Sequence, residues 1–268
     1  MAAVPQSASS PQGDPLVTVA RDGGVVRLTL NRPSQFNALS EDLMRAVQAE
    51  LERVAGDASA RVVVIGGAGK AFCAGHDLRE MRANPSHDYY RALFAQCARM
   101  MVTIQQLPQP VIARVHGIAT AAGCQLVAMC DLAVASADAR FAVSGVNLGL
   151  FCSTPAVALS RNLSRKAAFE MLVTGEFIDA QTAAARGLVN RVVAPEALDA
   201  EIERLAASIC AKPPVAIAAG KGLFYRQLEM GIDAAYQLAG QTMACNMMDE
   251  SALEGVQAFI EKRPPDWK

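Results

Sequence analysis

Strand-like and helix-like patterns alternate along most of this chain, and that alternation restricts the possible folds more than any other feature of the sequence. Residues 25–30 alternate between apolar and polar side chains, whereas residues 61–65 contain a continuous β-branched run typical of a strand buried on both faces. Further strands are predicted at 111–115, 132–135 and 188–193, and helices from Ser40 onward and at 88–106, 119–129, 195–211 and 215–262. The alternation predicts an α/β fold with mostly parallel strands, in which functional loops gather at the strand ends.

Composition divides the chain into three segments. Residues 1–15 are small, polar and rich in proline, which predicts a disordered lead. Residues 16–200 hold the alternating pattern and form the predicted core, and a hydrophobic content of 52% over the whole chain is enough to fill one large core. Residues 201–268 are predicted to be helical, with Met and Leu stripes that pack either on this core or on neighbouring subunits.

Charge and cysteine content restrict the partners and the compartment. The chain has 25 Lys and Arg against 26 Asp and Glu, without long runs of one sign, so neither nucleic acid nor a membrane surface is an expected partner. No apolar stretch reaches the roughly 20 residues of a membrane span, and the first fifteen residues lack the pattern of a targeting peptide. Seven cysteines without a C-x-x-C pair are typical of reduced thiols. Together these features predict a cytoplasmic protein.

A glycine-rich segment, residues 66–78 (GGAGKAFCAGHDL), follows the strand predicted at 61–65 and first suggests a nucleotide-binding loop. A P-loop would need glycine at Val64 and Ser or Thr at Ala71, and a dinucleotide fingerprint would need glycine at Phe72. Both patterns fail. What remains is a tight turn that exposes backbone N–H groups, which are one component of an oxyanion hole.

A second segment of small residues, 116–125 (HGIATAAGCQ), runs from a predicted strand into a predicted buried helix. Backbone donors at a helix N-terminus point toward an anion, so this turn and the turn in 66–78 together could hold a developing enolate from two directions. Small residues also let a helix pack closely on a sheet without any catalytic role. The spacing alone leaves both interpretations open.

Motifs along nearly the whole chain resemble the crotonase (enoyl-CoA hydratase/isomerase) superfamily, and within it the group of enoyl-CoA hydratase domain-containing protein 3 and its bacterial relatives. The matching segments lie between Leu28 and Trp267, in the same order as in that superfamily. They include NRP at 31–33, NAL at 37–39, AFCAGHDL at 71–78, PVIARVHG at 110–117, AGC at 122–124, MCD at 129–131, LVTG at 172–175, ARGLV at 185–189 and FIEKR at 259–263.

This resemblance implies a spiral of ββα repeats with a helical C-terminal trimerisation region, assembled as a trimer or a dimer of trimers. It also implies a thioester substrate carried on coenzyme A, with no separate cofactor. The oxyanion hole would consist of the backbone N–H groups of His76 and Ala122, the latter standing where the family usually has glycine. Each such donor typically contributes roughly 3 kcal/mol to transition-state stabilisation.

The resemblance further implies a set of residues that line the coenzyme A and acyl site. They are Ala38, Ala74, His76, Asp77, Leu78, Arg79, Ala122, Phe259 and Lys262, the last of which would reach the phosphates of coenzyme A in a neighbouring subunit. No metal site is expected, because His76, His87 and His116 are far apart and have no ligand spacing with the cysteines.

The sequence departs from the family pattern at the two catalytic glutamates, whose positions hold Gln125 and Gly145. Hydratases use one glutamate as base and one as acid, and neither an amide nor glycine exchanges protons near neutral pH. Losing a positioned acid or base typically costs roughly 10² to 10⁴ in rate, which argues against ordinary hydration.

Two alternatives fit the missing glutamates. One is decarboxylation of a malonyl-type acyl-CoA, which needs an oxyanion hole more than a base, although Cys152 replaces the tyrosine that such decarboxylases carry. The other is a family member that binds acyl-CoA without turnover. A binder would show affinity for CoA esters alone, whereas an enzyme would consume at least one thioester.

Overall fold

A six-stranded sheet forms the centre of the fold in the structure, a computed structural model that describes residues 14–267. The predicted disordered lead at 1–15 therefore lies almost entirely outside the described residues. The sheet has the order β1-β2-β3-β4-β6-β9, antiparallel between β1 and β2 and parallel elsewhere. Its strands are β1 (Val17–Asp22), β2 (Val25–Leu30), β3 (Val62–Gly67), β4 (Val111–Val115), β6 (Leu132–Ser136) and β9 (Arg191–Val193).

A second, three-stranded sheet has the order β5-β7-β8, and it comprises β5 (Ile118–Thr120), β7 (Arg140–Ala142) and β8 (Ile178–Asp179). The helices of the α/β part are α1 (Glu41–Ala55), α2 (Leu78–Ala83), α3 (His87–Gln106), α4 (Ala122–Met129), α5 (Ser153–Asn162), α6 (Arg165–Thr174), α7 (Ala180–Ala185) and α8 (Leu198–Cys210). Short 3-10 turns lie at η1 (Pro33–Gln35), η2 (Ser144–Leu148) and η3 (Pro195–Ala197).

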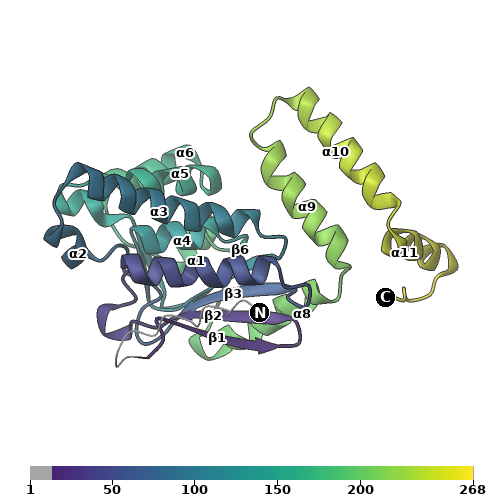
Figure 1. The fold of residues 1–268 in the computed structure, drawn as a ribbon, viewed down its shortest axis with the longest axis horizontal. Helices are drawn as coiled ribbons and strands as arrows, with labels where there is room; N and C mark the ends of the chain where they lie inside the picture. Colours follow the sequence, from purple (N-terminus) through teal and green to yellow (C-terminus); the bar gives the residue numbers. More distant parts are fainter. Residues whose placement is uncertain (1–13, 268) are drawn as a thin grey trace, which may run out of the picture.

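Strand β3 explains why the sheet needs cover on both faces. Successive side chains of a strand point to opposite faces, so Val63 and Ile65 enter the larger apolar core while Val62 and Val64 enter a smaller one. Figure 1 shows α1 and α3 on one side of the sheet and α8 on the other. The β-branched run in the sequence therefore predicted a doubly covered strand correctly.

Most predicted element boundaries are confirmed. Ser40 caps α1 by accepting a hydrogen bond from the Leu43 N–H at 3.1 Å, and Ser164 and Asp179 cap α6 and α7 in the same way. Gly175 ends α6 with a φ of +63°, a conformation that glycine adopts without strain.

Two element boundaries and one strand differ from the sequence prediction. The helix predicted at 119–129 begins only at Ala122, because residues 118–120 pair with β7 instead. Strand β1 was not predicted, since after Val17 all of its residues are exposed and carry no apolar alternation. The strand predicted at 188–193 is limited to β9, because Leu188 and Val189 pack into the larger core before the strand begins.

Three further helices, α9 (Pro214–Gln227), α10 (Ile232–Met247) and α11 (Glu250–Glu261), follow the α/β part and extend away from it (Figure 1). They agree with the predicted helical character of the C-terminal region. The division of the chain into 16–200 and 201–268 stays a prediction. No helix in the described range 14–267 is long and apolar enough to cross a membrane.

A buried ion pair attaches α9 to the core. The Lys221 ammonium donates to the Asp131 carboxylate at 2.6 Å and to the carbonyls of Ile104 and Gln109 at 2.9 Å each, which uses all three of its N–H donors. The Tyr225 hydroxyl donates to the other Asp131 oxygen at 2.7 Å. Burial lowers the pKa of Lys221, and the neighbouring Asp131 opposes that shift. Complete hydrogen bonding makes a buried charge tolerable here.

We expect Lys221→Met to lower the free energy of unfolding by about 3 kcal/mol, because it leaves the Asp131 carboxylate buried without its counter-charge. The matched control is Arg161→Met, which breaks the Arg161–Glu229 pair between exposed side chains and is expected to cost less than about 1 kcal/mol. Urea denaturation of both variants measures the difference. Equal losses would contradict the role assigned to the buried pair.

Candidate active site

The two glycine-containing turns identified in the sequence lie side by side. Cys73 pairs with Ala119 in an isolated parallel bridge, in which the Cys73 N–H donates to the Ile118 carbonyl at 3.1 Å. The Cys73 carbonyl in turn accepts from the Thr120 N–H at 3.0 Å. These backbone hydrogen bonds connect the loop after β3 to the strand that leads into α4.

Two glycines permit the close approach of these turns. A Cβ atom on Gly123 would lie 2.1 Å from the Cys73 carbonyl oxygen, which is too close for any other residue. Gly75 has a φ of +93°, and a Cβ there would lie 3.4 Å from the Ala122 nitrogen. The turn that carries His76 therefore lies directly against the first residue of α4.

The backbone N–H groups of His76 and Ala122 have no hydrogen-bond partner among residues 14–267. Ala122 is the first residue of α4, where the helix leaves its N–H groups unsatisfied and carries a partial positive charge. Ala121, just before it, has a φ of +51°, a strained conformation for a residue with a side chain. Two free donors on adjoining turns can hold one oxyanion.

Arg32 and Asp77 support the His76 turn, and sequence reasoning missed the role of Arg32. The Arg32 guanidinium donates to Asp77 at 2.9 Å and to the Ala38 carbonyl at 2.6 Å. Burial alone would raise the pKa of Asp77, but hydrogen bonds from Arg32 and from the N–H groups at the start of α2 lower it below its usual value. The NRP motif drew attention to Arg32. No local pattern, however, indicated its pairing with Asp77, which lies 45 residues away in the sequence.

The half-buried His76 side chain lies beside aromatic rings of α3. Its ring makes an edge contact with Phe94 at 5.5 Å between centroids, and Phe94 stacks on Tyr90 at 6.4 Å. Burial lowers the pKa of His76 to about 4, and a hydrogen bond with the Leu39 backbone opposes that shift. The imidazole is therefore neutral near pH 7.

The positions of the family glutamates have different surroundings. Gln125 is buried in α4, and its Oε1 atom has no hydrogen-bond partner among residues 14–267. At Gly145, a Cβ atom would lie 2.3 Å from the Leu150 carbonyl oxygen and 2.7 Å from the Cys152 sulfur. The Gly145 N–H donates to that sulfur at 3.3 Å. The local backbone thus leaves no room for a side chain at residue 145.

Cys152 has a structural environment rather than that of a nucleophile. Its side chain is buried, and burial raises the pKa of its thiol while the Gly145 N–H opposes the shift. A thiol with a raised pKa is protonated near pH 7 and weakly reactive.

The predicted substrate-lining residues fall into two groups. Ala38, Ala74, Leu78 and Arg79 lie around the His76 turn, where the Ala74 N–H donates to the Phe36 carbonyl and the side chains of Leu78 and Arg79 are exposed. Phe259 lies in α11, and Lys262 is the residue that ends this helix. Figure 1 shows α2 and α11 at opposite ends of the molecule, so a single chain does not bring these two groups together.

The α/β core with two free backbone donors on adjoining turns is typical of a crotonase-type protein, and comparison with known proteins identifies the family. Residues 20–268 match the family model described as enoyl-CoA hydratase/isomerase, and the chain belongs to this family. Its resemblance to the group of enoyl-CoA hydratase domain-containing protein 3 is confirmed. The Xenopus laevis protein of that name is 46% identical over 261 residues, which cover 97% of this chain and 89% of the relative.

Two solved structures have the same fold. The crystal structure of an enoyl-CoA hydratase from Mycobacterium smegmatis superimposes with a TM-score of 0.94 at 67% identity, covering 95% of this chain and 99% of the other. The structure of human enoyl Coenzyme A hydratase domain-containing protein 3 gives a TM-score of 0.92 at 41% identity, covering 94% of this chain and all of the other. The predicted crotonase fold is confirmed.

The prediction of a cytoplasmic protein is wrong against these comparisons. The Xenopus laevis, Rattus norvegicus and Homo sapiens relatives are named as mitochondrial. The prediction rested on the first fifteen residues and on reduced cysteines. All seven cysteines are free thiols, but a free thiol is equally compatible with any reducing compartment.

We expect Gly123→Ala to destabilise the protein by about 2–3 kcal/mol, because its methyl group overlaps the Cys73 carbonyl oxygen and the two turns must separate. Gly222→Ala in α9 is the matched control, since a Cβ there meets no atom within 4 Å. It is expected to add up to about 1 kcal/mol through helix propensity. Urea denaturation distinguishes them, and a neutral Gly123→Ala would contradict the close approach.

The lowered pKa of His76 predicts that the stability of the protein depends on pH. Between pH 6.5 and about 4 the unfolded chain binds a proton at this residue and the folded chain does not, so stability falls as the pH is lowered through this window. The loss attributable to His76 is about 3 kcal/mol. Denaturation of wild type and His76→Gln at pH 7 and pH 4 isolates it, with the exposed His87→Gln as control. The same loss in all three proteins would contradict the assignment.

Proposed function

We propose that this protein is an acyl-CoA thioester enzyme that stabilises a thioester enolate with the backbone N–H groups of His76 and Ala122. The observation that carries the proposal is the pair of free donors on adjoining turns, brought together by Gly75 and Gly123. Membership in the enoyl-CoA hydratase/isomerase family supports a thioester of coenzyme A as the substrate. A relative from Escherichia coli, 35% identical to this chain, is named a 2,3-dehydroadipyl-CoA hydratase.

The reaction does not follow the two-glutamate route. Gln125 has an amide that orients groups but exchanges no proton near neutral pH. At residue 145 the backbone of Leu150 and the sulfur of Cys152 occupy the space that a glutamate side chain would need. Replacing Gly145 by glutamate would therefore also require the local backbone to move.

Decarboxylation of a malonyl-type thioester is the second candidate function. It passes through the same enolate and needs no general base, so the closed space at Gly145 does not obstruct it. Arg32, which contacts the His76 turn, already pairs with Asp77 and so is not free to hold the departing carboxylate. The geometry thus supports the enolate in general more strongly than this particular reaction.

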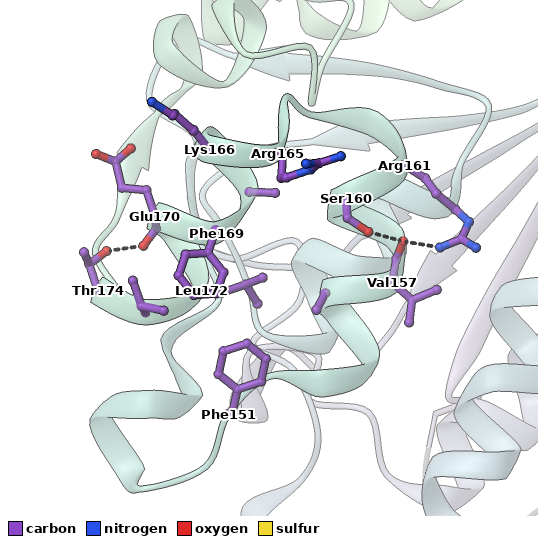
Figure 2. Close-up of a pocket in the computed structure, with 13 residues that line it drawn as sticks. Phe151, Val157, Ser160, Arg161, Arg165, Lys166, Phe169, Glu170, Leu172 and Thr174 are labelled. Carbon is purple, nitrogen blue, oxygen red and sulfur yellow. Dashed lines mark hydrogen bonds between the residues drawn. The ribbon is translucent and has the colours of Figure 1, made fainter.

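We also propose that the protein assembles as a trimer or a dimer of trimers. Helices α10 and α11 and the residue that ends α10 expose large apolar side chains. Among them are Tyr236, Met248 and Phe259, whose exposed fractions are 74%, 78% and 84%. A surface basin of about 810 Å³ on α5 and α6 is lined by Phe151 and Phe169, with basic side chains at its rim (Figure 2). Burial between copies accounts for both apolar surfaces, and it would allow Phe259 and Lys262 to complete the site of another copy.

The oxyanion hole is tested by infrared spectroscopy of an acetyl-CoA labelled with ¹³C at its carbonyl. Two N–H donors polarise this carbonyl, so binding to wild type lowers its stretching frequency. Ala122→Pro removes one donor at the first position of α4, where proline is tolerated, and is expected to reduce the shift by about half. Alongside, wild type is expected to hydrate crotonyl-CoA roughly 10² to 10⁴ times more slowly than a family member with both glutamates.

The control is Arg165→Pro, which places proline at the first position of α6, away from the site. It is expected to leave the carbonyl frequency of bound acetyl-CoA as in wild type. An unshifted carbonyl in wild type would overturn the oxyanion assignment. Rapid hydration of crotonyl-CoA would overturn the claim that the two-glutamate route is lost.

A further inference from the structure

The His76 N–H group belongs to the same peptide as the Gly75 carbonyl, and the backbone at Leu39 holds that carbonyl. The Leu39 N–H donates to the Gly75 carbonyl at 2.7 Å. The Leu39 carbonyl accepts from the Asp77 N–H at 3.1 Å, which completes an isolated parallel bridge between Leu39 and His76. In a trans peptide the carbonyl and the N–H point in opposite directions. The hydrogen bond from Leu39 therefore sets the direction of the His76 N–H.

A second peptide group extends this line of hydrogen bonds to Arg32. The Leu39 N–H belongs to the same peptide as the Ala38 carbonyl, and that carbonyl accepts from the Arg32 guanidinium at 2.6 Å. The line thus begins at a cation and passes through two peptide groups. It ends at the His76 N–H, which has no partner among residues 14–267.

Asp77 fixes the guanidinium in this position. Arg32 donates to the Asp77 carboxylate at 2.9 Å, and the same carboxylate accepts from the Arg79 N–H at 3.0 Å at the start of α2. The side chains of Arg32 and Asp77 are only 17% and 11% exposed, so solvent screens the guanidinium in part. A fixed cation that is shielded from water polarises the carbonyl it contacts more strongly than an exposed one.

Hydrogen bonds in such a line strengthen one another, because a peptide N–H becomes a better donor when the carbonyl of the same peptide accepts a hydrogen bond. We propose that Arg32 is a positioning residue, which orients and polarises the His76 N–H donor through these two peptide groups. The inference rests on the proposed function, since it requires a thioester carbonyl to bind at that donor. Arg32 does not touch the substrate in this role.

The test is the infrared stretching frequency of acetyl-CoA, labelled with ¹³C at its carbonyl, bound to Arg32→Gln and Arg32→Lys. Glutamine keeps an N–H donor without the charge, and it is expected to lose roughly 10–30% of the wild-type frequency shift, as for one cooperative hydrogen bond. Lysine keeps the charge and is expected to retain most of the shift. In Ala122→Pro combined with Arg32→Gln, His76 is the remaining donor, so the fractional loss should be about twice as large.

Arg27→Gln is the matched control. It removes a partly exposed arginine that pairs with Glu203 of α8, on the other side of the sheet from α1 and α3, and it should leave the shift as in wild type. Arg32→Met gives a second measurement of the lost charge if Arg32→Gln does not fold.

Equal shifts in wild type and Arg32→Gln would overturn the inference, even if the variant binds acetyl-CoA more weakly. Weaker binding with an unchanged carbonyl would indicate that Arg32 contacts the CoA phosphates directly. An equal loss of shift in Arg32→Gln and Arg32→Lys would also overturn it, because the charge would then have no effect on the donor. An unshifted carbonyl in wild type would instead overturn the proposed function, so the two failures are distinguishable.

Discussion

The close contact between the Cys73 carbonyl and Gly123 is the constraint on which the rest of the site depends. A Cβ atom at residue 123 would lie only 2.1 Å from that oxygen, so only glycine fits there. Helix α4 can therefore begin directly against the loop after β3. This contact sets the position of the Ala122 N–H relative to the His76 turn. The strained φ of Ala121, at +51°, lies at the same junction. Strain of this kind persists only where surrounding contacts fix the backbone, as they do here on both sides.

Much of the fold was predictable from the sequence because its signals are local. The β-branched run at β3 and the Ser40 cap act over a few residues, and both predictions were confirmed. Strand β1 was missed because, after Val17, its exposed side chains leave no apolar pattern. For the site, the family motifs give the positions of His76 and Ala122, and their assignment as oxyanion donors stays a prediction. The partnership of Arg32 with Asp77 and the closed space at Gly145 depend on contacts between distant segments or on loop shape, which no local pattern encodes.

The two positions that the family resemblance assigns to glutamates differ physically. Gln125 places a buried polar atom in α4. Gly145 has no side chain, and the Leu150 carbonyl and the Cys152 sulfur occupy the space that one would need. Restoring a carboxylate at 125 would need only one exchanged atom, whereas restoring one at 145 would require the η2 turn to rebuild. An acid–base pair at residues 125 and 145 is therefore blocked by backbone geometry at 145, whereas the free N–H groups of His76 and Ala122 do not depend on either side chain.

Two titratable groups in the interior of this chain, Lys221 and His76, are accommodated in different ways. Lys221 is buried with all three of its donors satisfied, by Asp131 and two carbonyls, and its charge helps to hold α9 on the core. The His76 ring lies against Phe94 and has a hydrogen bond with the Leu39 backbone, and burial lowers its pKa to about 4. Near pH 7 this imidazole is uncharged, so its burial needs no counter-charge of the kind that Asp131 supplies to Lys221.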